Sequence, residues 1–188
     1  LRPWAPKAPS VIATAAKTLA EMTIFLWYFI IVCGTNLYFR KCLYVNIKIP
    51  KTKQMRNILI IGAGRSAISL IKYLLDKSTE EKLFLTIGDI NIQNAQKLTS
   101  GHPNGRGILL DVFNEEQRKE AVKNSDVVIS MLPARFHIEV ARDCITYGKH
   151  LITASYISDE MQLLDPMVKE KGLVFMNEIG LDPGIDHM

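Results

Sequence analysis

A glycine-rich loop is the part of the sequence whose residue types and spacing point most directly to chemistry. Gly62, Gly64 and Ala67 occupy the small-residue positions of the pattern G-x-G-x-x-G/A, directly after the apolar run at residues 58–61. In this pattern the first glycine permits a tight turn, the second lets backbone approach a pyrophosphate, and the third small residue lets a helix pack on the strand. The first N–H groups of that helix favour an anion. The spacing therefore predicts a dinucleotide-binding loop.

Three further residues in this region are candidates for cofactor contacts. Arg65 and Ser66 lie in the first turn after the loop, and Asp89 follows the next predicted strand, about twenty residues on. An acid there accepts hydrogen bonds from the adenosine ribose and repels the 2′-phosphate of NADP, so Asp89 predicts a preference for NAD. Two alternatives stay open: Arg65 could bind that phosphate, and Asp89 could simply open the next helix.

From Met55 onward, strand and helix patterns alternate without a break. Apolar runs predict strands at residues 58–61, 83–87, 108–110, 126–130, 150–153 and 173–176. Helical spacing follows the glycine loop and recurs at residues 92–98, 115–123, 136–147 and 159–171, with a loop at 101–107. Five consecutive strand-helix-strand crossovers indicate an α/β fold, a doubly wound Rossmann-type parallel sheet.

Ligands of such sheets bind beyond the carboxyl ends of the strands. These ends share small, polar or turn-forming residues, which form the candidate site: Gly62, Asp89, Leu110-Asp111, Leu132-Pro133, Ser155-Tyr156 and Glu178.

Composition argues against several other classes of protein. Residues 1–54 hold eight Lys and Arg against one acid, which leaves 15 basic and 18 acidic residues in 55–188. The predicted folded part is therefore mildly acidic, which disfavours nucleic-acid binding. The cysteines, Cys33, Cys42 and Cys144, show no metal-ligand or disulfide spacing, so we expect no metal site and a reducing compartment.

The leader, residues 1–54, has a different character. Residues 22–39 form an uncharged run near the minimum length of a membrane helix, and basic residues follow it. A membrane anchor would leave the nucleotide domain on the cytoplasmic side. A leader that is dispensable or not natural coding sequence is the alternative, because Met55 directly precedes the first strand. In either case we expect a cytoplasmic nucleotide domain over residues 55–176.

Three segments at the predicted strand ends carry a resemblance to a known family. They read SMLPARFH at 130–137, TASYIS at 153–158 and NEIGLDPGIDHM at 177–188. With the glycine loop, they resemble saccharopine dehydrogenases (saccharopine reductases). The resemblance implies a nicotinamide-dependent enzyme that interconverts saccharopine and water with L-glutamate and 2-aminoadipate 6-semialdehyde. In that family GLDPG leads into a second domain that holds much of the substrate site, so we expect this chain to be truncated before it and inactive alone.

The resemblance also implies roles for individual residues. Cofactor contacts carry over to the glycine loop, to Leu110-Asp111 and to Ser155-Tyr156, and the substrate would approach Pro133, Ala134, Arg135 and the Leu181-Asp182 turn. Some relatives have Tyr-Thr in place of Ala134-Arg135. Arg135 suits a substrate carboxylate, although it could equally be an exposed residue at the start of a helix.

The proton shuttle is not assigned by the sequence. His137 and His187 are candidates, but a single histidine at a helix start or domain junction is usually structural. Cys144 has apolar neighbours at helical spacing and is expected to pack in the core.

Two other functions remain open. One is a dehydrogenase of similar build, of the carboxynorspermidine or homospermidine type, and the other is a non-catalytic, membrane-tethered nucleotide-binding module. The enzyme reading implies a small amino-acid substrate and a homodimer formed through the second domain.

Overall fold

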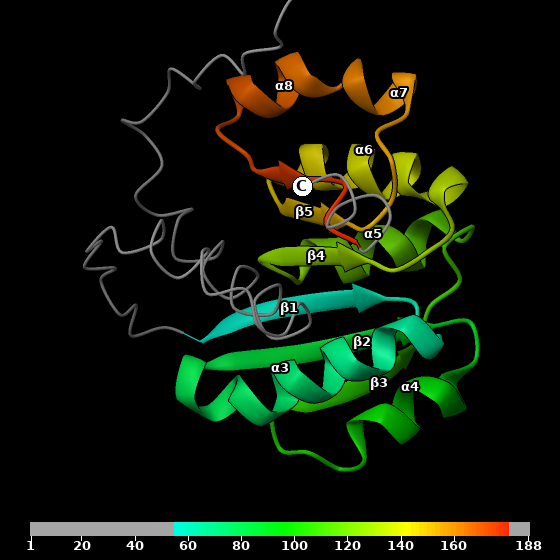
Figure 1. Ribbon diagram of the computed structural model, residues 1–188, viewed down its shortest axis with the longest axis vertical. Helices are drawn as coiled ribbons and strands as arrows, with labels where there is room; N and C mark the ends of the chain where they lie inside the picture. Colours follow the sequence, from blue (N-terminus) through cyan, green and yellow to red (C-terminus); the bar gives the residue numbers. More distant parts are fainter. Residues whose placement is uncertain (1–54, 181–188) are drawn as a thin grey trace, which may run out of the picture. The chain divides into compact units, whose positions relative to one another are not determined.

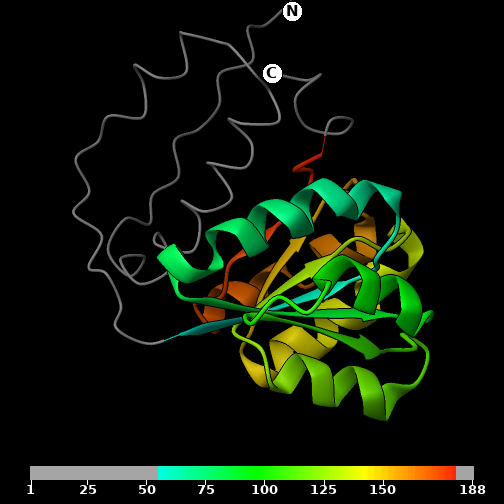
Figure 2. The ribbon, with the colours of Figure 1, turned by 90° about the horizontal axis from the view of Figure 1, so that it is seen from below.

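The computed structural model describes residues 55–180, which form a six-stranded sheet with helices on both faces (Figures 1 and 2). The strands are β1 (Arg56–Ile61), β2 (Leu83–Asp89), β3 (Gly105–Leu109), β4 (Val127–Ser130), β5 (His150–Thr153) and β6 (Phe175–Met176). The helices are α3 (Ile68–Glu81), α4 (Ile92–Thr99), α5 (Glu115–Lys123), α6 (His137–Tyr147), α7 (Asp159–Gln162) and α8 (Asp165–Glu170). Short 3₁₀ turns, η1 (Arg65–Ala67) and η2 (Ala134–Phe136), precede α3 and α6.

The strand order is β3-β2-β1-β4-β5-β6, and every neighbouring pair is parallel (Figure 1). This order confirms the predicted doubly wound Rossmann sheet. The chain builds outward from β1 to β3 and then returns to the other side of β1 with β4. The point where the order reverses lies between β1 and β4, where Ile61 pairs with Ser130. Ligands of such sheets bind in the crevice at that point.

Helices cover both faces of the sheet, which explains why its strands are apolar on both sides. α3 and α4 contact β2 and β3 on one face, while α5 and α6 lie on the other (Figure 2). The core on the second face joins β1, β4 and β5 to α5, α6, α7 and α8. Cys144 belongs to this core and is fully buried, as predicted.

The third strand begins earlier than predicted, because Gly105 to Gly107 belong to β3 and not to the preceding loop. Glycine is needed at these positions because α3 and α4 pack so closely on the strand that they leave no space for a Cβ atom. A Cβ at Gly107 would lie 2.6 Å from the backbone nitrogen of Gln96, and one at Gly105 would lie 2.7 Å from a methyl of Leu75. Glycine in this strand therefore reflects close packing, which the turn-like composition concealed.

The predicted helix at 159–171 is also different, since it is broken into α7 and α8. Pro166 lies in the first turn of α8, where its missing N–H is tolerated. Within a continuous helix the same proline would remove a hydrogen bond and clash with the preceding turn. The last strand is shorter than predicted and contains only Phe175 and Met176.

Several predictions fall outside the residues that the structure describes. They concern the leader at 1–54, with its candidate membrane run at 22–39, and Leu181, Asp182 and His187 near the end. Within 55–180, no helix has the length and apolar character needed to cross a membrane. The division of the chain at residues 54 and 176 stays a prediction.

Candidate functional site

The glycine loop leaves β1 at the switch point of the sheet. Gly62 has φ +103°, a conformation that residues with a side chain rarely adopt, and its N–H donates to the carbonyl of Gly88 at 2.8 Å. A Cβ on Gly62 would also lie 3.1 Å from the carbonyl oxygen of Met131, just after β4. Glycine is therefore required at Gly62 both by the turn and by the closeness of the neighbouring loop.

Gly64, the second glycine of the loop, is not required by the backbone conformation. Gly64 has an ordinary extended conformation, φ −73° and ψ 176°, and a Cβ there would meet no described atom within 4 Å. It precedes η1 and α3, and no side chain caps the start of either. Ala67, which is fully buried, seats the helix against the sheet. Open space before an uncapped helix start fits a phosphate group, whose oxygens would accept from the exposed N–H groups.

Asp89 ties this loop to the next one. Its Oδ2 accepts from the N–H of Ala63 at 2.7 Å, and its Oδ1 accepts from the N–H of Asn91 at 2.8 Å. Both carboxylate oxygens are thus engaged with backbone, and Asp89 holds the glycine loop against the start of α4. This contact was not predicted from sequence, where Asp89 was considered only as a ribose ligand or a surface acid.

The turn after β3 brings Leu110 and Asp111 to the same edge. Leu110 is buried, and its close approach to β2 depends on Gly88, where a Cβ would lie 2.6 Å from a Leu110 methyl. Asp111 opens a turn, since its Oδ1 accepts from the N–H of Phe113 at 2.9 Å. Its own N–H donates to Gln117 Oε1 of α5 at 3.2 Å.

A buried ion pair fixes the continuation of this turn. Arg118 of α5 and Asp143 of α6 are about 5% exposed, and Arg118 Nε donates to Asp143 Oδ2 at 2.5 Å. Arg118 Nη1 also donates to the carbonyl of Val112 at 2.6 Å. This pair was not predicted from the sequence, because a basic residue in a polar helix gives no sign of burial.

The segment after β4 carries the predicted substrate contacts. Pro133, Ala134 and Arg135 are exposed, and Ala134 begins η2. The Arg135 guanidinium lies over the Phe136 ring, 4.6 Å from its centroid, and the Phe113 ring meets Phe136 edge-on at 5.0 Å. Arg135 is therefore accessible at this edge, as either sequence interpretation requires.

His137 lies between the ends of β4 and β5. Its Nδ1 is 2.8 Å from Ser130 Oγ, and its Nε2 is 2.8 Å from Ser155 Oγ. The imidazole is only 3% exposed, and this burial lowers its pKa. Sequence analysis named His137 and Ser155 separately but did not pair them. A serine at a strand end, followed seven residues later by a histidine at a helix start, is the signal that was available.

The loop after β5 is braced from β6. Glu178 has φ +59°, its N–H donates to the carbonyl of Ser155 at 3.1 Å, and its Oε1 accepts from the N–H of Ile157 at 3.1 Å. Tyr156, between the residues that Glu178 holds, is 58% exposed. Glu178 therefore shapes the loop that presents Ser155 and Tyr156.

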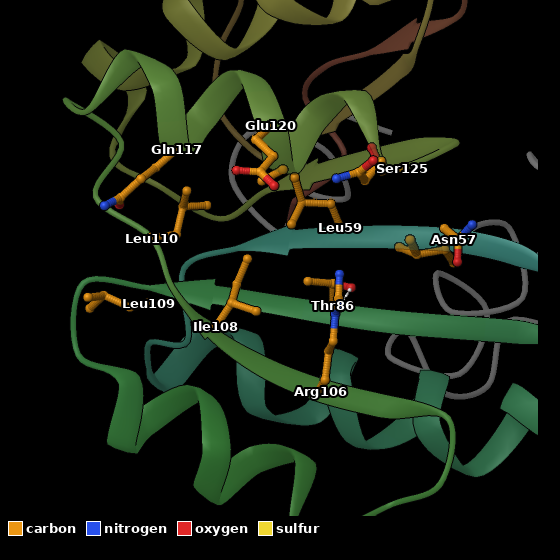
Figure 3. Close-up of a pocket in the computed structure, with 13 residues that line it drawn as sticks. Asn57, Leu59, Thr86, Arg106, Ile108, Leu109, Leu110, Gln117, Glu120 and Ser125 are labelled. Carbon is orange, nitrogen blue, oxygen red and sulfur yellow. Dashed lines mark hydrogen bonds between the residues drawn. The ribbon is translucent and has the colours of Figure 1, made fainter.

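Two hollows adjoin this edge without coinciding with the glycine loop. One, of about 290 Å³, follows the sheet face beside α5, with Glu120 and Gln117 on one side and Thr86 and Arg106 on the other (Figure 3). It touches the candidate site at Leu110. The other, of about 270 Å³, lies under Phe113 and Phe136. The glycine loop is the better candidate for the cofactor, because a dinucleotide extends over the strand ends and needs no enclosed cavity.

All the described candidates are therefore gathered at one edge. The structure places the glycine loop, Asp89, Leu110-Asp111, Leu132-Pro133 and Ser155-Tyr156 beyond the carboxyl ends of successive strands, as predicted. Whether each contacts a cofactor stays a prediction. Within 55–180, no three His, Cys, Asp or Glu side chains gather into an arrangement able to hold a metal ion.

Comparison with known proteins now decides the family. Residues 58–176 match the domain described as the saccharopine dehydrogenase NADP binding domain. The chain belongs to the saccharopine dehydrogenase family. This confirms the resemblance noted in the sequence.

Individual relatives agree with the assignment to the saccharopine dehydrogenase family. The chain is 36% identical over 134 residues to the saccharopine dehydrogenase [NADP(+), L-glutamate-forming] of Schizosaccharomyces pombe, covering 71% of this chain and 29% of that protein. It is 34% identical over 156 residues to the alpha-aminoadipic semialdehyde synthase of Arabidopsis thaliana, covering 74% of this chain and 15% of that protein. The chain thus spans less than a third of the length of these relatives.

A solved structure supports the same family. Apo saccharopine dehydrogenase (L-Glu forming) from Saccharomyces cerevisiae superposes with a TM-score of 0.64 at 35% identity, covering 70% of this chain and 29% of that one. The two relatives named saccharopine dehydrogenase are oxidoreductases, and their names specify NADP or leave the cofactor open. They give no support to the preference for NAD predicted from Asp89.

Proposed function

We propose that this chain is the cofactor-binding part of a saccharopine dehydrogenase of the L-glutamate-forming type. Such an enzyme converts saccharopine, water and NADP⁺ into L-glutamate, 2-aminoadipate 6-semialdehyde, NADPH and a proton. The proposal is supported by the 36% identity to the Schizosaccharomyces pombe enzyme of that name. The uncapped helix start at Gly64, placed at the switch point of the sheet, is the structural observation that carries it.

The residues of this chain bind and orient the cofactor in this proposal. When bound, the nicotinamide accepts the hydride. The N–H groups after Gly64 would hold the pyrophosphate, the residues at the ends of β2 and β3 would meet the adenosine half, and those at the ends of β4 and β5 would meet the nicotinamide half. His137 is buried between two hydroxyls, which suits positioning better than exchange of protons with a substrate.

The cofactor in this proposal is NADP rather than NAD. The carboxylate of Asp89 is already engaged by the N–H groups of Ala63 and Asn91, so holding the loops accounts for an acid at this position. Arg65 is exposed in the first turn after Gly64 and carries the charge that a 2′-phosphate would need. We assign that phosphate to Arg65.

The substrate is a small amino acid that meets Arg135. Saccharopine carries three carboxylates, and a planar guanidinium binds a carboxylate through two parallel hydrogen bonds. Arg135 is exposed at the strand edge beside Ala134. The predicted contacts at Leu181 and Asp182 belong to the same proposal.

The location of the protein and its association with other molecules belong to the same proposal. We propose a cytoplasmic location, because the cofactor is available there and because the basic residues after 22–39 would keep the nucleotide domain on that side of a membrane. Membrane attachment through residues 22–39 and a homodimer formed by the rest of such an enzyme stay predictions.

Gly64→Ala tests the proposal, because it separates binding from folding. Alanine fits the backbone angles of Gly64 and meets no described atom, so the free energy of unfolding should stay equal or rise by about 0.4–1 kcal/mol. The new methyl group would stand where the pyrophosphate approaches, so affinity should fall. Urea denaturation of the full chain measures the free energy of unfolding, and calorimetric titration with NADPH and NADH measures the affinity. Absence of binding by the wild-type chain, or unchanged affinity in Gly64→Ala, would refute the proposal.

A further inference from the structure

A chain of three polar side chains crosses the edge of the sheet at the switch point. Ser130 ends β4, His137 begins α6, and Ser155 follows β5. Each imidazole nitrogen of His137 lies 2.8 Å from one serine hydroxyl. Ser130 is fully buried and His137 is 3% exposed, while Ser155 is only half-buried. These three hydrogen-bonded side chains therefore extend from the interior of the domain to its ligand-facing edge.

The buried contact between Ser130 and His137 determines which imidazole nitrogen carries the proton. Among the residues that the structure describes, His137 is the hydrogen-bond partner of the Ser130 hydroxyl. If Nδ1 carried the imidazole proton, it would donate to Ser130, whose own O–H would then be buried without an acceptor. A buried unpaired hydroxyl costs about 1–3 kcal/mol. If Nδ1 is unprotonated, it accepts from Ser130 and no group is left unpaired.

The favoured arrangement continues outward from His137. With Nδ1 as the acceptor, the neutral ring carries its proton on Nε2, which donates to Ser155 Oγ. The Ser155 hydroxyl, having accepted this bond, directs its own proton away from His137. At a half-buried position on the strand edge, that proton points to whatever ligand lies there.

We infer that His137 is a positioning residue, which makes the Ser155 hydroxyl a hydrogen-bond donor to an acceptor oxygen of the nicotinamide riboside half of the cofactor. This rests on the proposed function, which lays that half over β4 and β5. The acceptor is a ribose or carboxamide oxygen. His137 does not touch the ligand; it sets the direction of the Ser155 O–H bond before the ligand arrives, so that less ordering is needed on binding.

The first test reads the tautomer directly in the free protein. The full chain is labelled with isotopic nitrogen in its histidines, and long-range proton–nitrogen NMR identifies which ring nitrogen of His137 carries hydrogen. We expect a neutral ring protonated on Nε2, and Ser130→Ala, which removes the donor to Nδ1, should weaken this preference. A ring protonated on Nδ1 would overturn the inference, because Ser155 would then donate to His137.

The second test measures NADPH affinity in a double-mutant cycle. Ser155→Ala removes one hydrogen bond and should weaken binding roughly three- to tenfold. His137→Leu should weaken it by a similar factor, and the double variant should be no weaker than Ser155→Ala alone, because His137 acts through Ser155. His137→Gln, whose amide both donates and accepts, should restore affinity to within about twofold of wild type.

His150→Gln is the matched control. His150 lies at the opposite end of β5, where its Nδ1 accepts from the N–H of Val174 at 3.1 Å. This variant should leave NADPH affinity unchanged. Unchanged affinity in His137→Leu, or losses that add in the double variant, would overturn the inference. If the wild-type chain bound no cofactor, the proposed function would fail, and the tautomer of the free chain would still decide whether His137 directs Ser155.

Discussion

At the scale of single residues, the position of Asp89 in the sequence and its contacts in the structure indicate different roles. The spacing predicted a ribose ligand, whereas the carboxylate joins the N–H groups of Ala63 and Asn91. Asp89→Ala should therefore lower the free energy of unfolding by about 1–3 kcal/mol and loosen the glycine loop. Affinity for both NADPH and NADH should fall, which calorimetric titration measures.

Asp126→Ala is the control for that change. Asp126 also accepts from the backbone of β1, through Oδ2 and the N–H of Asn57 at 2.7 Å, but at the other end of the strand. It should cost comparable stability and leave cofactor affinity unaltered. If Asp89→Ala instead strengthened NADPH binding alone, Asp89 would be a ribose-side residue and not a brace of the loop.

His137 makes stability depend on pH. Burial is the cause of its lowered pKa, and both of its hydrogen-bond partners are uncharged hydroxyls. As the pH falls below the ordinary value of 6.5, the unfolded chain takes up a proton that the folded chain resists. The contribution of His137 to the free energy of unfolding should therefore be complete above about pH 6.5 and decrease as the pH falls below that value. Urea denaturation across this range should show a flatter profile for His137→Gln; an identical profile would contradict the assignment.

At the scale of elements, the ion pair between α5 and α6 connects the helices to the site. Arg118 donates to Asp143 and to the carbonyl of Val112, so it fixes the turn that carries Leu110 and Asp111. Asp143→Ala removes the buried partner of the Arg118 guanidinium and leaves it the Val112 carbonyl and the half-exposed Glu139 carboxylate, 3.9 Å away. The loss of a buried charge partner should cost about 3–5 kcal/mol of stability. Chemical denaturation measures this cost.

An exposed pair provides the comparison. Lys169 and Asp165 form an ion pair of the same 2.5 Å length on α8, with side chains more than half exposed. Asp165→Ala should cost about 0–1 kcal/mol, because water already solvates both charges. Equal losses in the two variants would show that burial of Arg118 does not determine the strength of its pairing.

At the scale of the whole molecule, the candidate site depends on strands that are distant in sequence. The site exists because β1 and β4 are neighbours, which places the glycine loop beside Ser130 and the segment after it. The parallel direction of every strand then collects each candidate residue at one edge.

The sequence alone determined the fold class, the family and the edge at which the site lies. Apolar runs, helical spacing and glycine positions are local signals, and each follows from the geometry of one element or one turn. Single positions such as Gly62, Gly64 and Cys144 could be assigned for the same reason. The boundaries of helices and strands were predicted wrongly where a local signal was ambiguous, as at Pro166 between α7 and α8 and at the glycines of β3.

Only the tertiary structure decided which polar groups meet. Arg118 and Asp143 are 25 residues apart in sequence. His137 lies 7 residues after Ser130 and 18 residues before Ser155, and it contacts both. Asp89 likewise reaches back 26 residues to Ala63. Local spacing can at most suggest such a contact, as the seven-residue spacing from Ser130 to His137 does, because a polar residue has the same spacing whether its side chain meets water or a buried partner. Burial and hydrogen bonding are set by the packing of the whole sheet. They show that Asp89, predicted as a ribose contact, also joins two loops, and that His137, a candidate proton shuttle, lies between two serine hydroxyls.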